Sequence, residues 1–249
     1  MAKGGVVVIG EPHLPLAFLG EVGQAFDFIV HGQQAETASI HVGGPHQVLD
    51  LAWTQLKLTG LAMTLALVIA LPAGLVLGHY GKGELFAVSL GNAGRAIPEL
   101  VIIALMATVI GVGLGNVTIA LAILAVPPIL TNTFVAVRQV DRGAIDAARG
   151  MGMTTAGLIT KVELPLAVPT IMGGVRTSTI NVVATATIAP LAGVLTLGDF
   201  IISRNVYGDD GVLAGAICAA LLALGLELAL AGLQRLLTSP GIRLQQSPA

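Results

Sequence analysis

The residues of this chain that could do chemistry gather in one short segment and at a few isolated positions. The segment 141–165 mixes charged and small residues in an otherwise apolar sequence. Asp141 suits the N-cap of a short helix, Gly150 and Gly152 can end that helix and turn the chain, and Thr154 can cap a second one. Two short helices at an angle, with small residues on their surface, predict a docking site for a partner protein. An ordinary connecting loop with well-formed caps is the alternative.

Charged side chains inside long apolar stretches form a second group, because ionisable groups at membrane depth are costly and are often functional. Arg95 and Glu99 are four residues apart on either side of Pro98, so they share one helix face. They either line a passage or neutralise each other as a structural pair. Arg176 is expected to extend toward water, and Glu227 to make a hydrogen bond inside a helix bundle.

Hydroxyl and amide groups form a third group within one apolar stretch: Thr177, Asn181, Thr185 and Thr187. Repeated polar positions suit the wall of a passage, although Ser and Thr can also bond the backbone of their own helix. The small residues Gly173 and Gly174 are expected to permit close helix packing.

Several chemistries are not supported by the sequence. No phosphate-binding G-x-x-x-x-G-K-[ST] loop is present, and the histidines are scattered without ligand spacing, so no catalytic, cofactor or metal residue is predicted. The net charge of −2 gives no basic face for nucleic acid. Trp53, Tyr80 and Tyr207 are the only Trp and Tyr residues. They form no sequence cluster that could surround a quaternary ammonium ion.

The elements that position these residues are membrane helices. The chain of 249 residues has 55% hydrophobic and only 10% charged residues, against roughly 25% charged in a soluble domain. We predict an all-α integral membrane protein whose five spans follow the uncharged stretches. A turn is expected at 111–116, Pro98 is expected to kink the second span, and 194–210 to be re-entrant or at the surface. The expected spans are 57–80, 85–110, 116–138, 166–193 and 211–236, with the loop at 139–164.

Lys and Arg near the span ends set the orientation. One side carries only Lys3, Lys57 and Arg204, whereas the other carries Lys82, Arg138, Arg142, Arg149, Lys161, Arg235 and Arg243. The loop 139–164 and the tail 239–249 are therefore expected in the cytoplasm and the N-terminus outside. Residues 1–50 form an extracytoplasmic extension in which 16–31 is either an interfacial amphipathic helix or part of a disordered segment.

The loop resembles the EAA loop of ABC-importer permeases, E-A-A-x-x-x-G, then nine residues, then I-x-L-P. Asp146, Ala147 and Ala148 stand for E-A-A, Gly152 is the glycine, and Val162 to Pro165 follow at the right spacing, with Asp for Glu and Val for Ile as departures. The resemblance implies a five-span permease core in which this loop docks on an ATP-binding subunit. The expected coupling residues are Asp146, Ala147, Ala148, Gly150, Gly152, Leu164 and Pro165.

The resemblance extends over residues 57–238 to the osmoprotectant branch, which serves glycine betaine, carnitine and choline. The stretches that carry it are 147–154, 161–176, 185–189, 197–201 and Arg95 to Pro98, although Glu99 departs from the pattern. It implies alternating access driven by a partner ATPase that binds ATP and Mg, together with an extracytoplasmic binding protein and a second permease subunit, identical or paralogous. The alternatives are an importer for another solute such as an amino acid and, after it, an ATP-independent secondary transporter.

Overall fold

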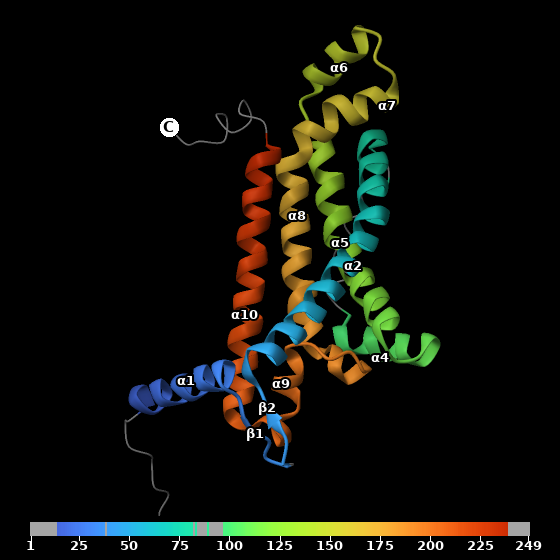
Figure 1. Ribbon diagram of the computed structural model, residues 1–249. Helices are drawn as coiled ribbons and strands as arrows, with labels where there is room; N and C mark the ends of the chain where they lie inside the picture. Colours follow the sequence, from blue (N-terminus) through green and yellow to red (C-terminus); the bar gives the residue numbers. More distant parts are fainter. Residues whose placement is uncertain (1–13, 38, 82, 84–88, 90–96, 239–249) are drawn as a thin grey trace, which may run out of the picture.

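The computed structural model describes residues 14–37, 39–81, 83, 89 and 97–238, and side chains from residue 20 onward. Figure 1 shows a bundle of long helices, with two short helices projecting from one end and a horizontal helix, a hairpin and short helices at the other. The horizontal helix α1 (Leu14–Val30) leads into a small antiparallel hairpin of β1 (Gln33–Gln34) and β2 (His41–Val42).

Four helical stretches of the described chain are long and apolar enough to cross a membrane. They are α2 (Gly44–Tyr80), α5 (Leu114–Arg138), α8 (Leu164–Thr185) with the turns that flank it, and α10 (Arg204–Leu237). The shorter apolar helix α4 (Glu99–Ile110) covers the end of the second expected span. Residues 85–88 and 90–96 of that span lie outside the described residues, as do the tail 239–249 and residues 1–13.

Three helix bounds differ from the predictions. The predictions followed the uncharged stretches, which show where the chain crosses the hydrocarbon core but not where each helix begins and ends. The helix expected to begin at residue 57 begins at Gly44, and its 37 residues exceed what a ~30 Å core needs. The fourth span ends as a 3₁₀-helix, η2 (Ala186–Ala192), and the last helix begins at Arg204. Between them the chain forms the short helix α9 (Gly198–Ile202).

Helix α5 lies at the centre of the bundle, packed between α2 and α8. Glycines allow the close approach: a Cβ added at Gly74 of α2 would lie 2.6 Å from Thr133 Cβ, and one at Gly174 of α8 2.6 Å from Asn132 Cβ. Gly173, for which packing was also predicted, faces open space. Small residues that let backbones approach are the usual means of packing helices in lipid.

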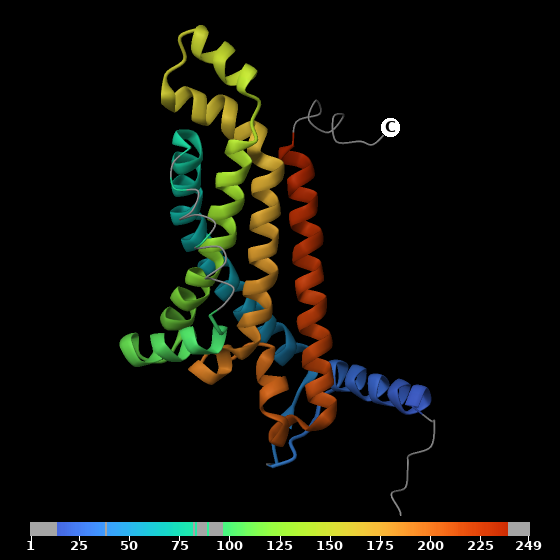
Figure 2. The ribbon, with the colours of Figure 1, turned by 180° about the vertical axis from the view of Figure 1, so that it is seen from behind.

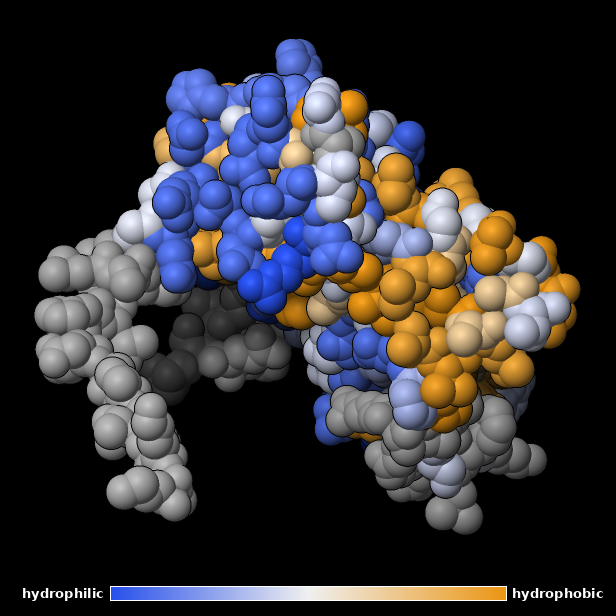
Figure 3. Space-filling view, turned by 90° about the horizontal axis from the view of Figure 1, so that it is seen from below, coloured by the Kyte–Doolittle hydropathy of each residue, from blue (hydrophilic) through white to orange (hydrophobic). Residues whose placement is uncertain are grey.

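The two ends of the bundle differ in character. In the view of Figure 3, hydrophilic residues gather over the hairpin and α9, and hydrophobic residues lie to one side, over α4. Helix α4 exposes several large apolar side chains: Leu100, Val101, Leu105, Val109 and Ile110. An exposed apolar face of this kind suits contact with lipid.

Candidate functional site

The projecting loop is built from two capped helices. Asp141 caps α6 (Arg142–Gly150), with its Oδ2 accepting from the Ala144 N–H at 3.1 Å. Thr154 caps α7 (Thr155–Leu158), with its Oγ1 accepting from the Gly157 N–H at 3.3 Å. Gly152 lies between them with φ +82°, in the left-handed region that favours glycine. The caps and the turn occupy the positions at which the sequence predicts them.

The exposure of the loop separates the predicted coupling residues into two groups. Ala147, Gly150 and Gly152 are exposed, and a Cβ added at either glycine would meet no atom within 4 Å. The Asp146 side chain is also exposed, 4.0 Å from that of Arg149. Ala148, by contrast, is only 3% exposed. Its methyl group packs inside the chain, whereas Ala147 is exposed on the loop surface.

The second loop helix does not end at Leu158. It continues as a π-helical turn, η1 (Ile159–Glu163), in which the Leu164 N–H reaches the Ile159 carbonyl, and leads directly into α8. Pro165 contributes to this irregular turn because it has no N–H for an α-helical hydrogen bond. Leu164 packs against the bundle core and Pro165 is exposed. The loop is thus joined to α8 without a break in helical structure, as Figure 2 shows from behind.

A buried polar contact below the loop was not predicted. His79 Nδ1, near the end of α2, and Glu163 Oε1, at the end of η1, lie 2.8 Å apart, with side chains 8% and 3% exposed. The other carboxylate oxygen, Oε2, has no hydrogen-bond partner among the residues that the structure describes. His79 and Glu163 are 84 residues apart, so no local pattern in the sequence could indicate that they meet. The contact joins the first expected span to the start of the fourth.

The cavity beside this contact is lined by two elements of the loop and two span ends. Its volume is about 220 Å³, and its lining residues are His79, Arg138, Arg142, Ile145, Asp146, Arg149 and Glu163. Arg142, Ile145, Asp146 and Arg149 are spaced i, i+3, i+4 and i+7, which places them on one face of α6. This face turns toward the bundle.

The polar residues predicted to line a passage fall into two groups on α8. Thr177 and Asn181, four residues apart, are exposed on the helix surface, whereas Thr185 is buried. Thr187 is half-buried in η2 and donates to the Ala184 carbonyl at 2.6 Å. An exposed polar pair on a helix of this length does not suit lipid, so Thr177 and Asn181 mark a face that requires another neighbour.

The predicted pair beside Pro98 is only partly described. Arg95 lies outside the described residues. Pro98 is the N-cap of α4, with an extended backbone, and does not stand inside a helix as predicted. Glu99, the first helical residue, is exposed and lies at the end of the helix where a negative charge is favourable.

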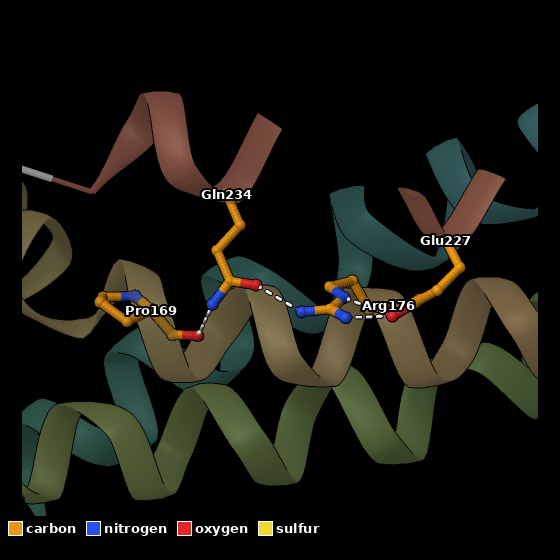
Figure 4. A network of polar contacts seen from close by, with 4 residues as sticks. All are labelled: Pro169, Arg176, Glu227 and Gln234. Carbon is orange, nitrogen blue, oxygen red and sulfur yellow. Dashed lines mark hydrogen bonds and ion pairs between the residues drawn. The ribbon is translucent and has the colours of Figure 1, made fainter. Parts of the chain in front are cut away.

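Arg176 does not extend freely to water as predicted, because it bonds across to α10. Figure 4 shows its guanidinium paired with Glu227, with a further bond of 2.8 Å to Gln234 Oε1. Gln234 Nε2 donates in turn to the Pro169 carbonyl at 3.1 Å. Glu227 thus makes the bundle hydrogen bond that the sequence indicates. The network holds α8 against α10, so its chemistry is structural.

At the opposite end of the bundle, the N-terminal segment packs against α9 and α10 through aromatic rings. These rings come from distant parts of the sequence and were not predicted to meet. Phe28 of α1, Phe200 of α9 and Tyr207 of α10 meet edge to face, with ring centroids 4.8 to 6.4 Å apart. All three are nearly fully buried and fill the space between one another, so they enclose no cage for a cation. The Tyr207 hydroxyl donates to Asp199 Oδ2 at 2.7 Å.

The same segment satisfies the backbone where α10 is broken at Gly208, which has φ 66°. Gln33 Nε2 donates to the Tyr207 carbonyl at 3.0 Å, and the Glu36 N–H donates to the Val206 carbonyl at 3.1 Å. Buried Gln55 of α2 bridges two further segments. Its amide donates to the Val183 carbonyl at 3.0 Å and accepts from the Leu197 N–H at 3.1 Å.

Comparison with known proteins gives consistent matches. Residues 54–239 match the family described as binding-protein-dependent transport system inner membrane component. The chain is 40% identical over 199 residues to the carnitine transport permease protein OpuCB of Listeria monocytogenes, covering 80% of this chain and 91% of that one. It is 35% identical to the choline transport system permease protein OpuBB of Bacillus subtilis (79% and 91% covered), and 33% identical to the osmoprotectant import permease protein OsmY of Salmonella typhimurium (77% and 82%).

Solved structures show the same fold. A structure of the MetNI methionine ABC transporter in an inward-facing conformation aligns with a TM-score of 0.68 at 21% identity, covering 78% of this chain and 97% of that one. An amino acid ABC transporter with histidines aligns with a TM-score of 0.60 at 22% identity (77% and 94% covered).

Proposed function

The chain belongs to the family of binding-protein-dependent transport system inner membrane components, and we propose that it is the permease of an importer for a quaternary-ammonium compatible solute. Its relatives are permease subunits of ABC importers for glycine betaine, carnitine and choline. The projecting α6–α7 loop carries the proposal, since a capped, exposed, small-residue surface at one end of the spans is what an ATPase subunit needs to dock.

We infer that the loop end faces the cytoplasm. Arg138, Arg142, Arg149 and Lys161 all lie at this end, and an excess of Lys and Arg is typical of cytoplasmic connections. The hairpin and α9 then lie outside, where a binding protein would deliver solute. In this orientation α1 lies across the span direction near the outer membrane surface, which supports the interfacial interpretation of residues 16–31.

The docking surface on the loop is formed by the exposed residues Asp146, Ala147, Gly150 and Gly152. Ala148 supports α6 from inside. Leu164 and Pro165 begin α8, so force applied at α7 passes into that helix through the continuous turn η1. ATP and Mg are held by the partner subunit.

The passage requires a second permease subunit, identical or paralogous. The exposed polar face at Thr177 and Asn181 supports this, because these side chains gain little from lipid and would line the space between two bundles. Half-buried Thr187 lies toward the outer end of the same span, whereas Thr185 is buried inside the bundle. Arg95, Pro98 and Glu99 on the second span are the other candidates for this wall.

Transport then follows alternating access. ATP binding closes two ATPase subunits, and their movement displaces the two loops of the permease pair. Because each loop continues into α8, and α8 is tied to α10 through Arg176 and Glu227, these two helices move together. The passage opens outward to receive solute from the binding protein and opens inward after hydrolysis.

The relatives support this class of solute. The described part of the chain gives no separate support, because its aromatic rings do not form a cage around a cation. The three clustered rings are packed solid, so recognition of a quaternary ammonium falls mainly to the binding protein. The alternative, import of an amino acid, is supported only by the fold that this chain shares with amino acid transporters. A secondary transporter would leave the projecting loop without a role.

Uptake by whole cells tests the proposal. Radiolabelled glycine betaine, carnitine, choline, methionine and histidine are offered to cells that lack their own compatible-solute importers and express this chain with its ATPase and binding protein. Uptake of at least one quaternary ammonium that stops without the ATPase supports the proposal. Uptake of an amino acid alone would show that the solute is an amino acid and not a quaternary ammonium compound. Uptake without the ATPase would refute the ATP-driven mechanism.

A further inference from the structure

The cavity between α6 and the bundle has no role in the proposed transport cycle, yet its lining is strongly polar. Three arginines, Arg138, Arg142 and Arg149, reach it from α5 and α6. Arg138 and Arg142 have no ion-pair partner among the residues that the structure describes, and Arg149 has only Asp146 at 4.0 Å. The cavity is also lined by two carboxylates, Asp146 and Glu163, so its three guanidinium groups outnumber them. An excess of guanidinium groups around one cavity is typical of sites that hold an anion.

The size and the donor pattern of the cavity narrow the class of ligand. About 220 Å³ is room for roughly seven water molecules, enough for a phosphate with a short polar arm. The planar guanidinium fork matches the oxygens of phosphate, which it can bind through two parallel hydrogen bonds. Glu163 also lines the cavity, and its Oε2 has no hydrogen-bond partner within the described part of the chain. A ligand that presents phosphate oxygens and a hydroxyl or ammonium donor would complement both the arginines and this carboxylate.

The place of the cavity favours a lipid headgroup as the source of the phosphate. Arg138 is the last residue of α5, and His79 is one residue from the end of α2, so the cavity lies where two membrane helices end. Basic pockets at the cytoplasmic ends of membrane helices are known lipid-headgroup sites. Of the proposed ATPase surface only Asp146 lines the cavity, whereas Ala147, Gly150 and Gly152 do not, so a ligand here leaves most of that surface free.

We propose that this cavity binds a phosphate group, supplied by the headgroup of an anionic phospholipid and held by Arg138, Arg142 and Arg149. A bound headgroup joins α6 to the end of α5, and so fixes the angle of the loop against the bundle. Only the assignment to the inner leaflet rests on the proposed function, because the arginine cavity exists whatever the orientation or the solute.

Native mass spectrometry of the purified full-length chain in detergent tests the site directly. The chain is titrated with phosphatidylglycerol, with phosphatidylcholine as the comparison lipid and inorganic phosphate as competitor. The variant R138Q/R142Q removes two guanidiniums, and R235Q removes one exposed arginine on the last turn of α10, outside the cavity. Loss of even one charge-assisted hydrogen bond is expected to weaken binding about tenfold or more.

The proposal predicts one tightly retained phosphatidylglycerol on the wild-type chain and on R235Q, and at least about tenfold weaker retention on R138Q/R142Q. Persistence of the lipid in excess inorganic phosphate identifies the headgroup as the source, whereas displacement identifies free phosphate at the same site. Equal retention by all three proteins overturns the proposal. If R138Q/R142Q is not recovered folded, the wild-type chain still tests the proposal: equal binding of phosphatidylcholine and phosphatidylglycerol overturns it. Transport is not read in this assay, so a wrong solute class cannot mimic either result.

Discussion

Substitution of Gly152 by aspartate, G152D, separates docking of the ATPase from folding of the permease. Gly152 has φ +82°, and a Cβ there would meet no atom within 4 Å. The new side chain therefore clashes with nothing in this chain. Its cost within the chain is the left-handed backbone alone, about 1–2 kcal/mol for most residues and less for Asp or Asn.

The larger effect arises at the proposed interface. A charge placed against the ATPase, desolvated and without a partner, should weaken docking by about 2–5 kcal/mol. That corresponds to roughly 30-fold to several-thousand-fold weaker association. The spans are stabilised by apolar length and by close packing such as Gly74 on α5, which the loop does not touch. We expect G152D to abolish uptake and to release the ATPase while the permease stays in the membrane.

Three quantities are measured on the same cells: solute uptake, ATPase recovered with the tagged permease, and permease in the membrane fraction. The control is G152N, which has the same size and a similar tolerance of the left-handed backbone but no charge, and should retain much more of the ATPase. Normal uptake with the ATPase still bound to G152D would refute the assignment of this loop as the docking site. Loss of the permease from the membrane would refute the claim that the loop is independent of folding.

Three further substitutions test the packing and the caps. G198A should prevent accumulation of folded permease, because its Cβ would fall far inside contact distance of a backbone carbonyl, whereas G60A, a helical glycine facing open space, should accumulate normally on a membrane immunoblot. Arg176→Leu should lower stability by about 2 kcal/mol, less than the loss of a fully buried pair, and Arg176→Leu with Glu227→Leu should recover part of it in a thermal melt in detergent. Asp141→Ala should destabilise α6 by about 1 kcal/mol and speed proteolysis of the loop, with cleavage elsewhere unchanged.

Local signals in the sequence were enough to predict the loop. Asp141 and Thr154 are short polar acceptors directly before helix-forming residues, and Gly152 is the residue that the left-handed turn requires. Each of these features depends on neighbours within three residues, so no tertiary information is needed. The apolar spans could be predicted for the same reason.

Features that depend on packing could not be predicted. Ala147 and Ala148 are identical in type and adjacent, yet one is exposed and the other 3% exposed, because only the docked position of α6 distinguishes them. His79 and Glu163 meet across the bundle, although they are 84 residues apart. The start of α2 was misplaced because polar residues can continue a helix beyond the hydrocarbon core, where charge no longer marks its end.

We propose that this chain transports solute only through an ATPase docked on α6 and α7. The most direct test of this proposal is reconstitution of the tagged permease in liposomes with the subunits that co-purify with it, followed by measurement of carnitine, choline and glycine betaine uptake. We expect uptake that requires ATP, the binding protein and the wild-type loop, and that is absent with G152D. Accumulation driven by an ion gradient without ATP, or no ATPase among the co-purified proteins, would contradict it.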